Sequence, residues 1–356
     1  MTPYYRHFGL ERDPFLDTAD PHFYRTTPGL MRARDRLVGG ILESRGLQAV
    51  VGDPGTGKTS LMAQLERELL GRDEVRLGKI LDPSFSTETE FLLGVARSFG
   101  LALPPRSPAA LKNALKNYLY DAAVLDGLTL ALLVDEAQNA SDDVFEVLRL
   151  LLNYDVPQRK LLNVVLFGQT ELRGRVEGRR NLADRVDEWI ALDPLDPAEA
   201  RALVAHRVAR AGGAADADAV FDDDALDVVV GAAGGTPRRL LTLAHATLRE
   251  AAAFGRPRAT RTDAEAAARA RGLTVPARPV PVVVAAPAPA VEQPPIAQAA
   301  QAAQPAQPLQ QAAQPAQQPV NGATQSATAE APAKAEEPAT PAWLRRFPWL
   351  AAFRAR

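Results

Sequence analysis

The sequence contains no cysteine among its 356 residues. This absence excludes disulfides, zinc sites built on thiolates and cysteine nucleophiles. The four histidines, His7, His22, His206 and His245, are scattered along the chain without the spacing of a metal site. The sequence therefore gives no sign of thiol chemistry or histidine–metal chemistry, and the lack of cysteine fits a cytoplasmic protein.

Large net charge and long apolar runs are also missing. The formal net charge is -2 and the isoelectric point is about 6.2, so we do not expect an overall nucleic-acid binder. No apolar run reaches the roughly eighteen residues that a membrane-spanning helix needs. Residues 1–15 carry charges and prolines where a signal peptide has its apolar region. These features predict a cytoplasmic protein, at most peripheral at the inner membrane, with DNA binding not indicated.

Composition divides the chain into a folded part and a tail. Residues 1–272 mix charged, aromatic and periodic apolar positions, as a packed fold requires. Residues 273–341 are almost entirely Ala, Pro, Gln and Val without an aromatic residue, which predicts a disordered tether. Residues 342–356 restore aromatics and add arginines. We expect this C-terminal tip to bind a protein partner or a membrane interface.

Strand and helix patterns alternate through the first half of the folded part. The run 128–134 is continuously apolar, which is typical of a central parallel strand buried on both faces. Further strands are expected at 47–51, 75–81, 163–167 and 189–192, and helices at 59–70, 88–98, 109–125, 144–152 and 170–186. The alternation predicts an α/β core over residues 1–195, with a parallel sheet sandwiched by helices. Residues 196–272 show helical patterns alone, which predicts a small all-helical lid domain.

The strongest motif is a glycine-rich loop between a predicted strand and a predicted helix. It reads Gly52-Asp53-Pro54-Gly55-Thr56-Gly57-Lys58-Thr59 and is followed by Ser60. This is the Walker A pattern, whose glycines let backbone N–H groups and a helix N-terminus face phosphates. Lys58 is expected to reach the β- and γ-phosphates of ATP, and the Thr59 hydroxyl is expected to bind Mg²⁺.

Two carboxylates close the apolar run 128–134. Burying them unpaired costs several kcal/mol, so Asp135 and Glu136 need a partner at this strand end. A bound Mg²⁺ would explain the two carboxylates at this position: Asp135 is expected to hold the metal, and Glu136 is expected to polarise the attacking water. The pattern is a Walker B motif, and its glutamate favours hydrolysis over passive binding.

Weaker signals concern one amide and several arginines. Gln169 ends the predicted strand 163–167, where it either orients water against the γ-phosphate or satisfies backbone groups in a turn. Arg238 begins a helix of the lid and is a candidate to fold back onto the phosphates. Arg185, with Arg179 and Arg180 as competitors, is a candidate arginine finger for a neighbouring subunit; a solvated basic helix face is the other interpretation.

The order of these motifs resembles the AAA+ superfamily, and further residues sharpen the likeness. The N-terminal residues concerned are Tyr5, Phe8-Gly9-Leu10, Pro14-Phe15, Thr18-Ala19-Asp20-Pro21 and Phe23. Later ones are Asp135-Glu136-Ala137-Gln138-Asn139, Leu148-Arg149-Leu150-Leu151-Leu152-Asn153, Gly168-Gln169-Thr170-Glu171-Leu172 and Leu192-Asp193-Pro194-Leu195. Together they resemble the ExeA/GspA family of secretion-associated ATPases over roughly residues 4–250.

The resemblance implies an ATPase that uses ATP and Mg²⁺ and associates with itself into a ring or dimer. It also implies a cytoplasmic role in assembling or remodelling an envelope machine such as a secretion or pilus system. From its own composition, the tip is expected to bind a protein partner in that machine. Two alternatives stay open. One is a DNA-associated helper of transposition or replication, which a basic DNA-binding appendage would favour. The other is a nucleotide-gated scaffold with little turnover, against which Glu136 argues.

Overall fold

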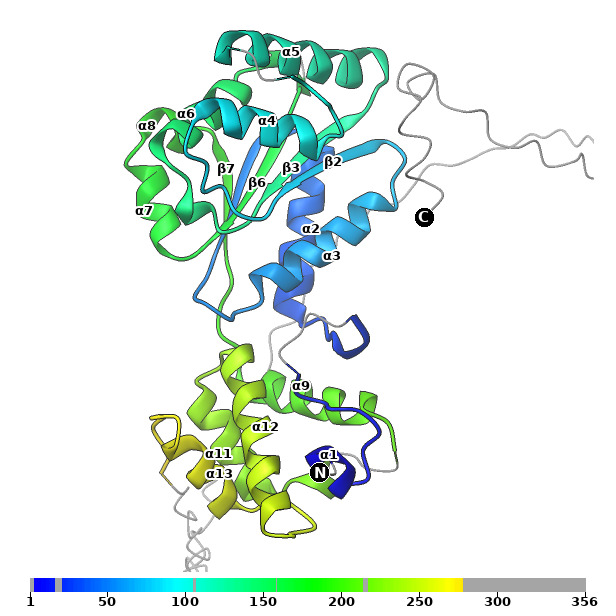
Figure 1. The fold of residues 1–356 in the computed structure, drawn as a ribbon, viewed down its shortest axis with the longest axis vertical. Coiled ribbons are helices and arrows are strands. Elements are labelled where there is room, and N and C mark those ends of the chain that lie inside the picture. Colours follow the sequence, from blue (N-terminus) through cyan, green and yellow to red (C-terminus); the bar gives the residue numbers. More distant parts are fainter. Residues whose placement is uncertain (1–2, 17–20, 105–106, 158, 214–216, 278–356) are drawn as a thin grey trace, which may run out of the picture. The chain divides into compact units, whose positions relative to one another are not determined.

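The computed structural model describes residues 3–16, 21–104, 107–157, 159–213 and 217–277. The predicted tip and nearly all of the predicted tether lie outside these residues. Within residues 1–277, which form one compact unit, the chain folds into a parallel sheet with helices on both faces, followed by a group of helices (Figure 1). This arrangement confirms the predicted α/β core and helical lid. None of the described helices is both long and apolar enough to cross a bilayer.

The sheet has five parallel strands in the order β2-β3-β6-β1-β7. Their bounds are β1 (Leu47–Val51), β2 (Val75–Ile80), β3 (Thr129–Val134), β6 (Asn163–Gly168) and β7 (Val186–Ala191). Because β6 lies between β1 and β3, the carboxyl ends of these three strands meet at one edge. That edge carries the glycine-rich loop, the two carboxylates and Gln169.

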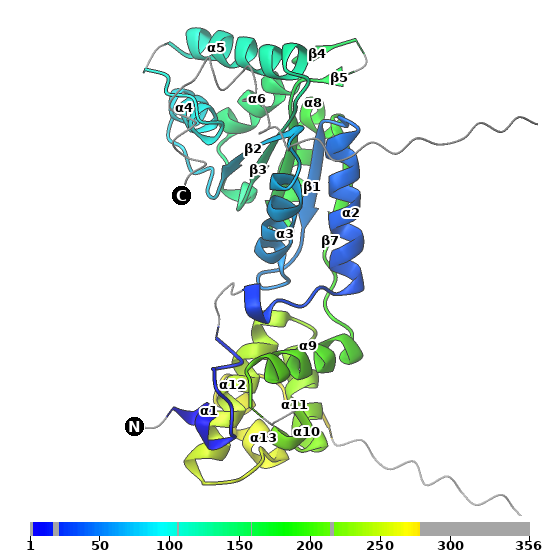
Figure 2. The same ribbon diagram turned by 90° about the vertical axis from the view of Figure 1, so that its right-hand side faces the viewer.

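Alternating side chains along the strands build two separate cores. On β1, Ala49 and Val51 belong to one apolar cluster and Val50 to the other, as the two-residue period of a strand requires. One face packs against α4 (Glu88–Ser98), α5 (Pro108–Tyr120), α6 (Asp142–Leu151), α7 (Glu171–Glu177) and α8 (Arg180–Ala183). The opposite face packs against α2 (Pro28–Leu42) and α3 (Lys58–Leu70) (Figure 2).

Helix α2 was not among the predicted elements, although it carries a local start signal. The Thr27 hydroxyl accepts a hydrogen bond from the Leu30 N–H at 3.2 Å, and Pro28 follows at the first helical position. Two consecutive glycines late in the helix weaken its sequence pattern. Gly40 packs closely on β1, since a Cβ there would stand 2.3 Å from Gln48 Nε2 and would require that side chain to move.

The lid consists of α9 (Pro197–Arg210), α10 (Ala217–Val220), α11 (Asp223–Ala233), α12 (Pro237–Ala253) and α13 (Arg261–Arg269). Its first helix begins with a capping box, in which Asp196 and Glu199 each accept a hydrogen bond from the other's backbone N–H. Helix α11 ends at Gly234, whose φ of 58° suits a residue without a Cβ. These four-to-seventeen-residue helices share one apolar core.

The N-terminal segment packs on the lid, whereas the predicted range 1–195 grouped it with the α/β core. Phe8, Leu10 and Phe15 are buried in the lid's apolar cluster. The backbone N–H groups of Glu11 and Arg12 both donate to the Ala211 carbonyl, at 3.2 and 3.0 Å. Helix α1 (Tyr4–His7) lies beside α12 in both views. Its apolar side chains find their partners in the lid, which local sequence does not reveal.

Other boundaries also differ from the predicted ones. The predicted helix 170–186 is wrong in its length, since it divides into α7 and α8 around Gly178 and ends before Val186. Val186 instead opens β7 three residues early, because β-branched and aromatic side chains suit a strand. The predicted helix 109–125 is α-helical up to Tyr120 and continues as a π-helical turn, Asp121–Leu125. A two-stranded hairpin of Asp155–Val156 (β4) and Arg159–Lys160 (β5) was not predicted.

Candidate nucleotide site

The glycine-rich loop joins β1 to α3 with the backbone that its sequence requires. Gly55 and Gly57 have φ values of +84° and +107°, which side-chain-bearing residues rarely adopt. A Cβ on Gly55 would lie 2.8 Å from Arg238 Cβ, so the loop and the lid touch through a glycine. Gly57 is also the N-cap of α3 and offers no capping side chain. The first N–H groups of α3 therefore remain for an anion at the helix N-terminus.

Lys58 is a buried cation at the start of α3. Its Nζ donates to the carbonyl oxygens of Gly52 and Asp53, at 2.7 and 3.0 Å. Burial lowers the pKa of Lys58, while the charges of Glu136 and Asp135 oppose that change. A buried ammonium held by two carbonyl groups and faced by carboxylates is suited to phosphate oxygens.

Asp135 and Thr59 come together from neighbouring elements. The Thr59 hydroxyl donates to Asp135 Oδ2 at 3.5 Å, and the Glu136 N–H donates to Asp135 Oδ1 at 3.0 Å. Burial raises the pKa of Asp135, and the adjacent Glu136 charge adds to the rise. A buried carboxylate and a hydroxyl oxygen beside a phosphate loop are the hard oxygen ligands that Mg²⁺ takes. The residues present therefore fit this metal.

Glu136 follows Asp135 in a left-handed backbone conformation, with φ 49° and ψ 37°. Its Oε2 accepts a hydrogen bond from Gln138 Nε2 at 2.5 Å. Gln169 follows β6, and its N–H donates to Gln138 Oε1 at 3.0 Å. Glu136 and Gln169 line the same cavity as Lys58 and Thr59. The structure thus gathers both carboxylates and the predicted polar residue at one sheet edge.

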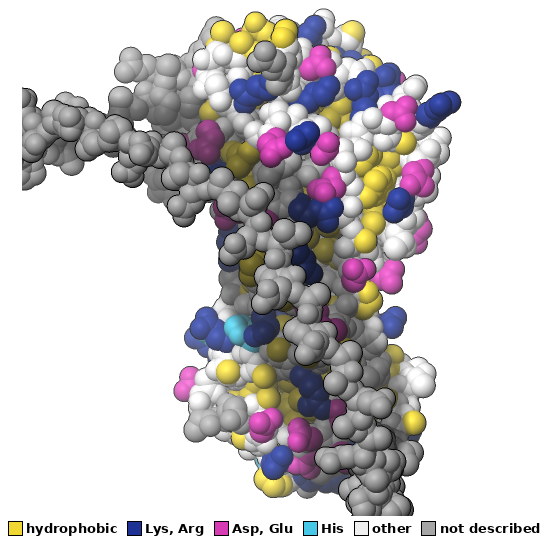
Figure 3. All heavy atoms as spheres, turned by 180° about the vertical axis from the view of Figure 1, so that it is seen from behind, with side chains coloured by type: hydrophobic (Ala, Val, Ile, Leu, Met, Phe, Trp, Pro, Cys, Tyr) yellow, Lys and Arg dark blue, Asp and Glu magenta, His cyan; other side chains and the backbone are white. Residues whose placement is uncertain are grey.

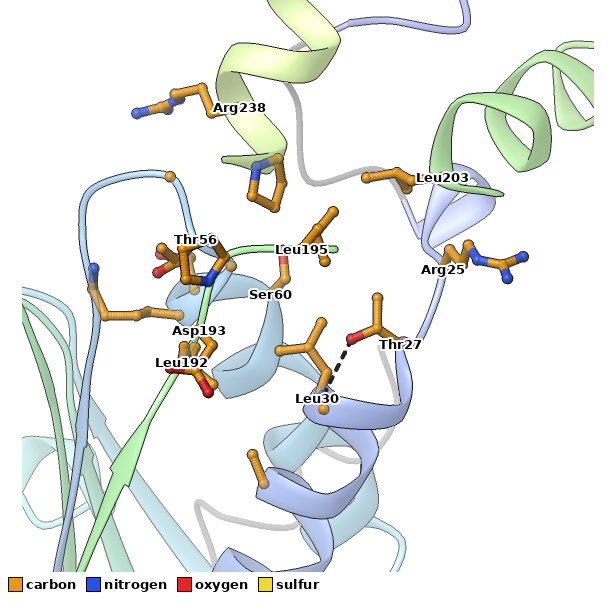
Figure 4. A pocket seen from close by; sticks show the side chains of 18 of the residues that line it. Arg25, Thr27, Leu30, Thr56, Ser60, Leu192, Asp193, Leu195, Leu203 and Arg238 are labelled. Atoms are coloured by element: carbon orange, nitrogen blue, oxygen red, sulfur yellow. Dashed lines mark hydrogen bonds between the residues drawn. The ribbon is translucent and has the colours of Figure 1, made fainter. Parts of the chain in front are cut away.

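The cavity has a volume of about 600 Å³ and extends from the loop to the lid. Its apolar part is lined by Leu30 of α2, Leu195 of the β7–α9 link and Leu203 of α9, which stand around one space in Figure 4 (Figure 4). An apolar recess beside a phosphate loop suits a nucleotide base. The sequence did not predict a role for these leucines in the site; the Thr27–Pro28 pair marks the start of α2 but does not indicate that Leu30 lies near the loop.

Arg238 lies over the loop at the first turn of α12. Its backbone N–H donates to the Gly55 carbonyl at 3.3 Å, and Arg238 is one of the residues that line the cavity. Figure 4 shows the side chain leaving α12 above the loop. The structure therefore places the predicted lid arginine at the predicted loop.

The candidate arginine fingers lie elsewhere. Arg185 directly precedes β7, whose first residue pairs with Leu47 at the start of β1, so it stands at the sheet edge opposite the loop. Its Nε is buried and has no hydrogen-bond partner among the described residues. Arg179 is engaged by Asp142, the Arg175 carbonyl and the Phe145 ring. Arg180 is exposed. Arg179 is thus the least available of the three.

Comparison with known proteins agrees with this geometry. Residues 41–176 match the AAA domain family. The chain is 32% identical over 270 residues to General secretion pathway protein A of Aeromonas hydrophila, a match that covers 74% of this chain and 48% of that protein. The chain spans about half the length of this curated relative.

Solved structures show the same fold. Cdc6p from Pyrobaculum aerophilum matches with a TM-score of 0.57 and 19% identity, covering 71% of this chain and 70% of that chain. The Aeropyrum pernix ORC2 protein in its ADPNP–ADP complexes matches with a TM-score of 0.54 and 17% identity, covering 73% and 71%. At these identities the likeness concerns the fold alone. The P-loop geometry, the AAA domain and the secretion relative together show that the chain has the AAA+ type of P-loop fold and resembles the ExeA/GspA family.

Proposed function

We propose that this chain binds ATP with Mg²⁺ and hydrolyses it to ADP and phosphate. The observation that carries the proposal is one sheet edge where Lys58, Thr59 and Glu136 line a single cavity and the Thr59 hydroxyl is hydrogen-bonded to Asp135. The open N-terminus of α3 and Lys58 hold the β- and γ-phosphates. The loop residues Gly52, Asp53, Pro54, Gly55, Thr56, Gly57 and Ser60 surround the phosphate chain.

Each polar side chain at this edge has a proposed task. Thr59 and Asp135 hold Mg²⁺, which neutralises the charge that develops on the phosphates. Glu136 accepts a proton from the attacking water, and Gln169 orients that water. Arg238 contacts the phosphates from the lid, so closure of the lid depends on the nucleotide. Leu30, Leu195 and Leu203 receive the base.

Self-association is proposed because an arginine of a neighbouring subunit would stabilise the charge that develops during hydrolysis. Arg185 stands away from its own loop, at the opposite edge of the sheet. An arginine there acts on a second copy of the chain, arranged in a dimer or ring.

The machine that this ATPase serves is proposed from the relative. The chain is 32% identical to General secretion pathway protein A over 270 residues, which supports ATP-driven assembly or remodelling of an envelope machine, such as a secretion or pilus system. On the face that Figure 3 shows, Lys and Arg side chains are interspersed with Asp and Glu over the α/β core. Mixed charge of this kind is typical of an ordinary solvated surface rather than a nucleic-acid site. We place the protein in the cytoplasm or peripherally at the inner membrane.

Partner capture tests the proposed role. The Glu136→Gln variant, held with ATP, is used as bait in cells that carry an envelope secretion or pilus system, with Lys58→Ala as the nucleotide-free control. We expect nucleotide-dependent capture of a component of that system, and less capture when residues 343–356 are deleted. Equal capture by Glu136→Gln and Lys58→Ala would overturn an ATP-driven role; enrichment of DNA-processing proteins would favour the DNA-associated alternative.

A further inference from the structure

The side-chain amide of Gln138 joins the loops that follow two strands. Gln138 lies in the 3₁₀ turn Ala137–Asn139, after β3. Its Nε2 donates to Glu136 Oε2 at 2.5 Å, and its Oε1 accepts from the Gln169 N–H at 3.0 Å. The amide orientation is determined by its partners, because a flipped amide would set oxygen against the carboxylate and N–H against N–H. Gln138 thus holds the Walker B loop and the end of β6 together.

The surrounding backbone is shaped for this contact. A Cβ on Gly168 would stand 3.0 Å from Gln138 Oε1 and 2.7 Å from Leu172 Cδ2, so a side chain at this position would crowd the amide of Gln138. Glu136 has a φ of 49°, a conformation that its neighbours must hold because residues with a Cβ rarely adopt it. Glu136 is therefore held in place both at its backbone and at its carboxylate Oε2.

A second set of contacts connects Gln138 to the helices that follow β6. An Arg175 guanidinium N–H donates to the Gln138 carbonyl, and Arg175 Cζ stands 5.2 Å from the centre of the Phe145 ring. Arg179 stacks on the same ring, and both arginines pair with Asp142. Figure 1 shows α6, α7 and α8 beside one another. A continuous series of contacts therefore runs from Glu136 to α7 and α8.

We propose that Gln138 is a positioning residue, which turns the Glu136 carboxylate toward the phosphates and connects its orientation to α7 through Arg175. Gln138 occupies Oε2 of Glu136, and the second carboxylate oxygen accepts the proton of the attacking water. A displacement of α7, which leads into the segment with Arg180 and Arg185, moves Arg175 and with it the turn that carries Gln138. The inference rests on the proposed ATP hydrolysis and assigns a role within it.

Gln138→Ala tests the positioning role. A carboxylate that loses its orientation costs on the order of tenfold to a hundredfold in turnover. We expect kcat to fall by that factor while the Kd for ATP, measured by calorimetry with Mg²⁺, stays within about twofold, because Gln138 does not touch the phosphates. Gln138→Leu, which keeps the volume of the side chain, should lose kcat equally. Asn139→Ala, in the same turn, is the matched control and should retain the wild-type kcat.

Arg175→Ala tests the connection to α7. We expect it to lower kcat several-fold without weakening ATP binding, and to add little to the loss in Gln138→Ala, because both changes disturb one set of contacts. Arg173→Ala, on the same helix but paired with Glu177 at 2.8 Å, is the control. Fully additive losses would overturn the connection.

The outcomes separate this inference from the proposed function. Undetectable turnover by the wild-type protein would overturn the proposed hydrolysis and the inference with it. If the wild type hydrolyses ATP and both Gln138→Ala and Gln138→Leu have the same kcat as the wild type, the positioning role alone is overturned. A parallel loss of kcat and ATP affinity in both variants would also overturn it, because general disturbance of the site would then explain the result.

Discussion

Lys58 is the single cation within residues 52–59, and it is buried against two backbone carbonyl groups. Replacing it with alanine removes the positive charge that the phosphates meet inside the loop. A hydrogen bond to a charged group is worth about 1.5–3 kcal/mol, so we expect Lys58→Ala to weaken ATP·Mg²⁺ binding at least about tenfold. Isothermal titration measures this, with Lys79→Ala, which removes an ion pair to Glu66 at 2.7 Å, as control. An affinity within a few-fold of the wild type would contradict the phosphate-loop assignment.

Residue by residue, the sequence predicted the parts of the site that depend on local pattern. The loop and the two carboxylates stand next to a strand in the chain, so spacing alone places Lys58 and Asp135. Leu30 and Leu203 reach the same cavity from elements far apart in sequence, and no local pattern brings them together. The sequence identifies Gln138 only as part of a family motif, because its role depends on a contact with Gln169, which follows a different strand.

At the scale of elements, the N-terminal segment is held to the lid by a small polar cluster. Tyr4 Oη donates to Asp13 Oδ1, His245 Nδ1 lies 3.1 Å from Tyr4 Oη, and the Phe15 N–H donates to Asp13 Oδ1 at 2.9 Å. Burial alone would raise the pKa of Asp13, but the interactions with His245, Tyr4 and the Phe15 N–H outweigh it, and the pKa is lowered below its usual 3.8. The ionised carboxylate is thus part of the attachment.

Asp13→Asn should loosen this attachment. A lowered folded-state pKa contributes stability that is present above about pH 3.8 and is lost as pH falls through the folded value. We therefore expect a lower thermal midpoint for Asp13→Asn at pH 7, faster hydrogen exchange in residues 4–16, and a difference from the wild type that shrinks as the pH falls below 3.8. Asp35→Asn, at an exposed carboxylate beside Arg34, is the control. Equal midpoints and exchange at pH 7 would contradict the role of Asp13.

Helices and strands with strong periodicity were predicted closely, whereas segments stabilised by distant partners were not. The helix Glu88–Ser98 and the strand Leu47–Val51 match their predicted ranges because their caps and apolar spacing are local. The division of 170–186 into α7 and α8 follows from packing on α6, where Leu172, Val176 and Leu182 are buried in one cluster. Packing of this kind overrides weak local propensity.

At the scale of the whole molecule, the opposite positions of Arg185 and the loop predict cooperation between copies. ATP turnover per chain should rise with protein concentration. Lys58→Ala and Arg185→Ala, each inactive alone, should regain some turnover when mixed, because a mixed interface joins an intact loop to an intact arginine. Arg179→Ala mixed with Lys58→Ala serves as the comparison. A rate independent of concentration, with no recovery on mixing, would show that the chain works as a monomer.

Glu136 is the proposed base that activates water for the hydrolysis of ATP held by the loop. Phosphate release by the wild type and by Glu136→Gln, each with ATP and Mg²⁺, tests it most directly. The carboxylate acts on water rather than on nucleotide, so the variant should bind ATP within about twofold of the wild type. Its turnover should be lower than that of the wild type by a factor on the order of 10² or more. Wild-type turnover in Glu136→Gln would contradict the account and revive the scaffold alternative.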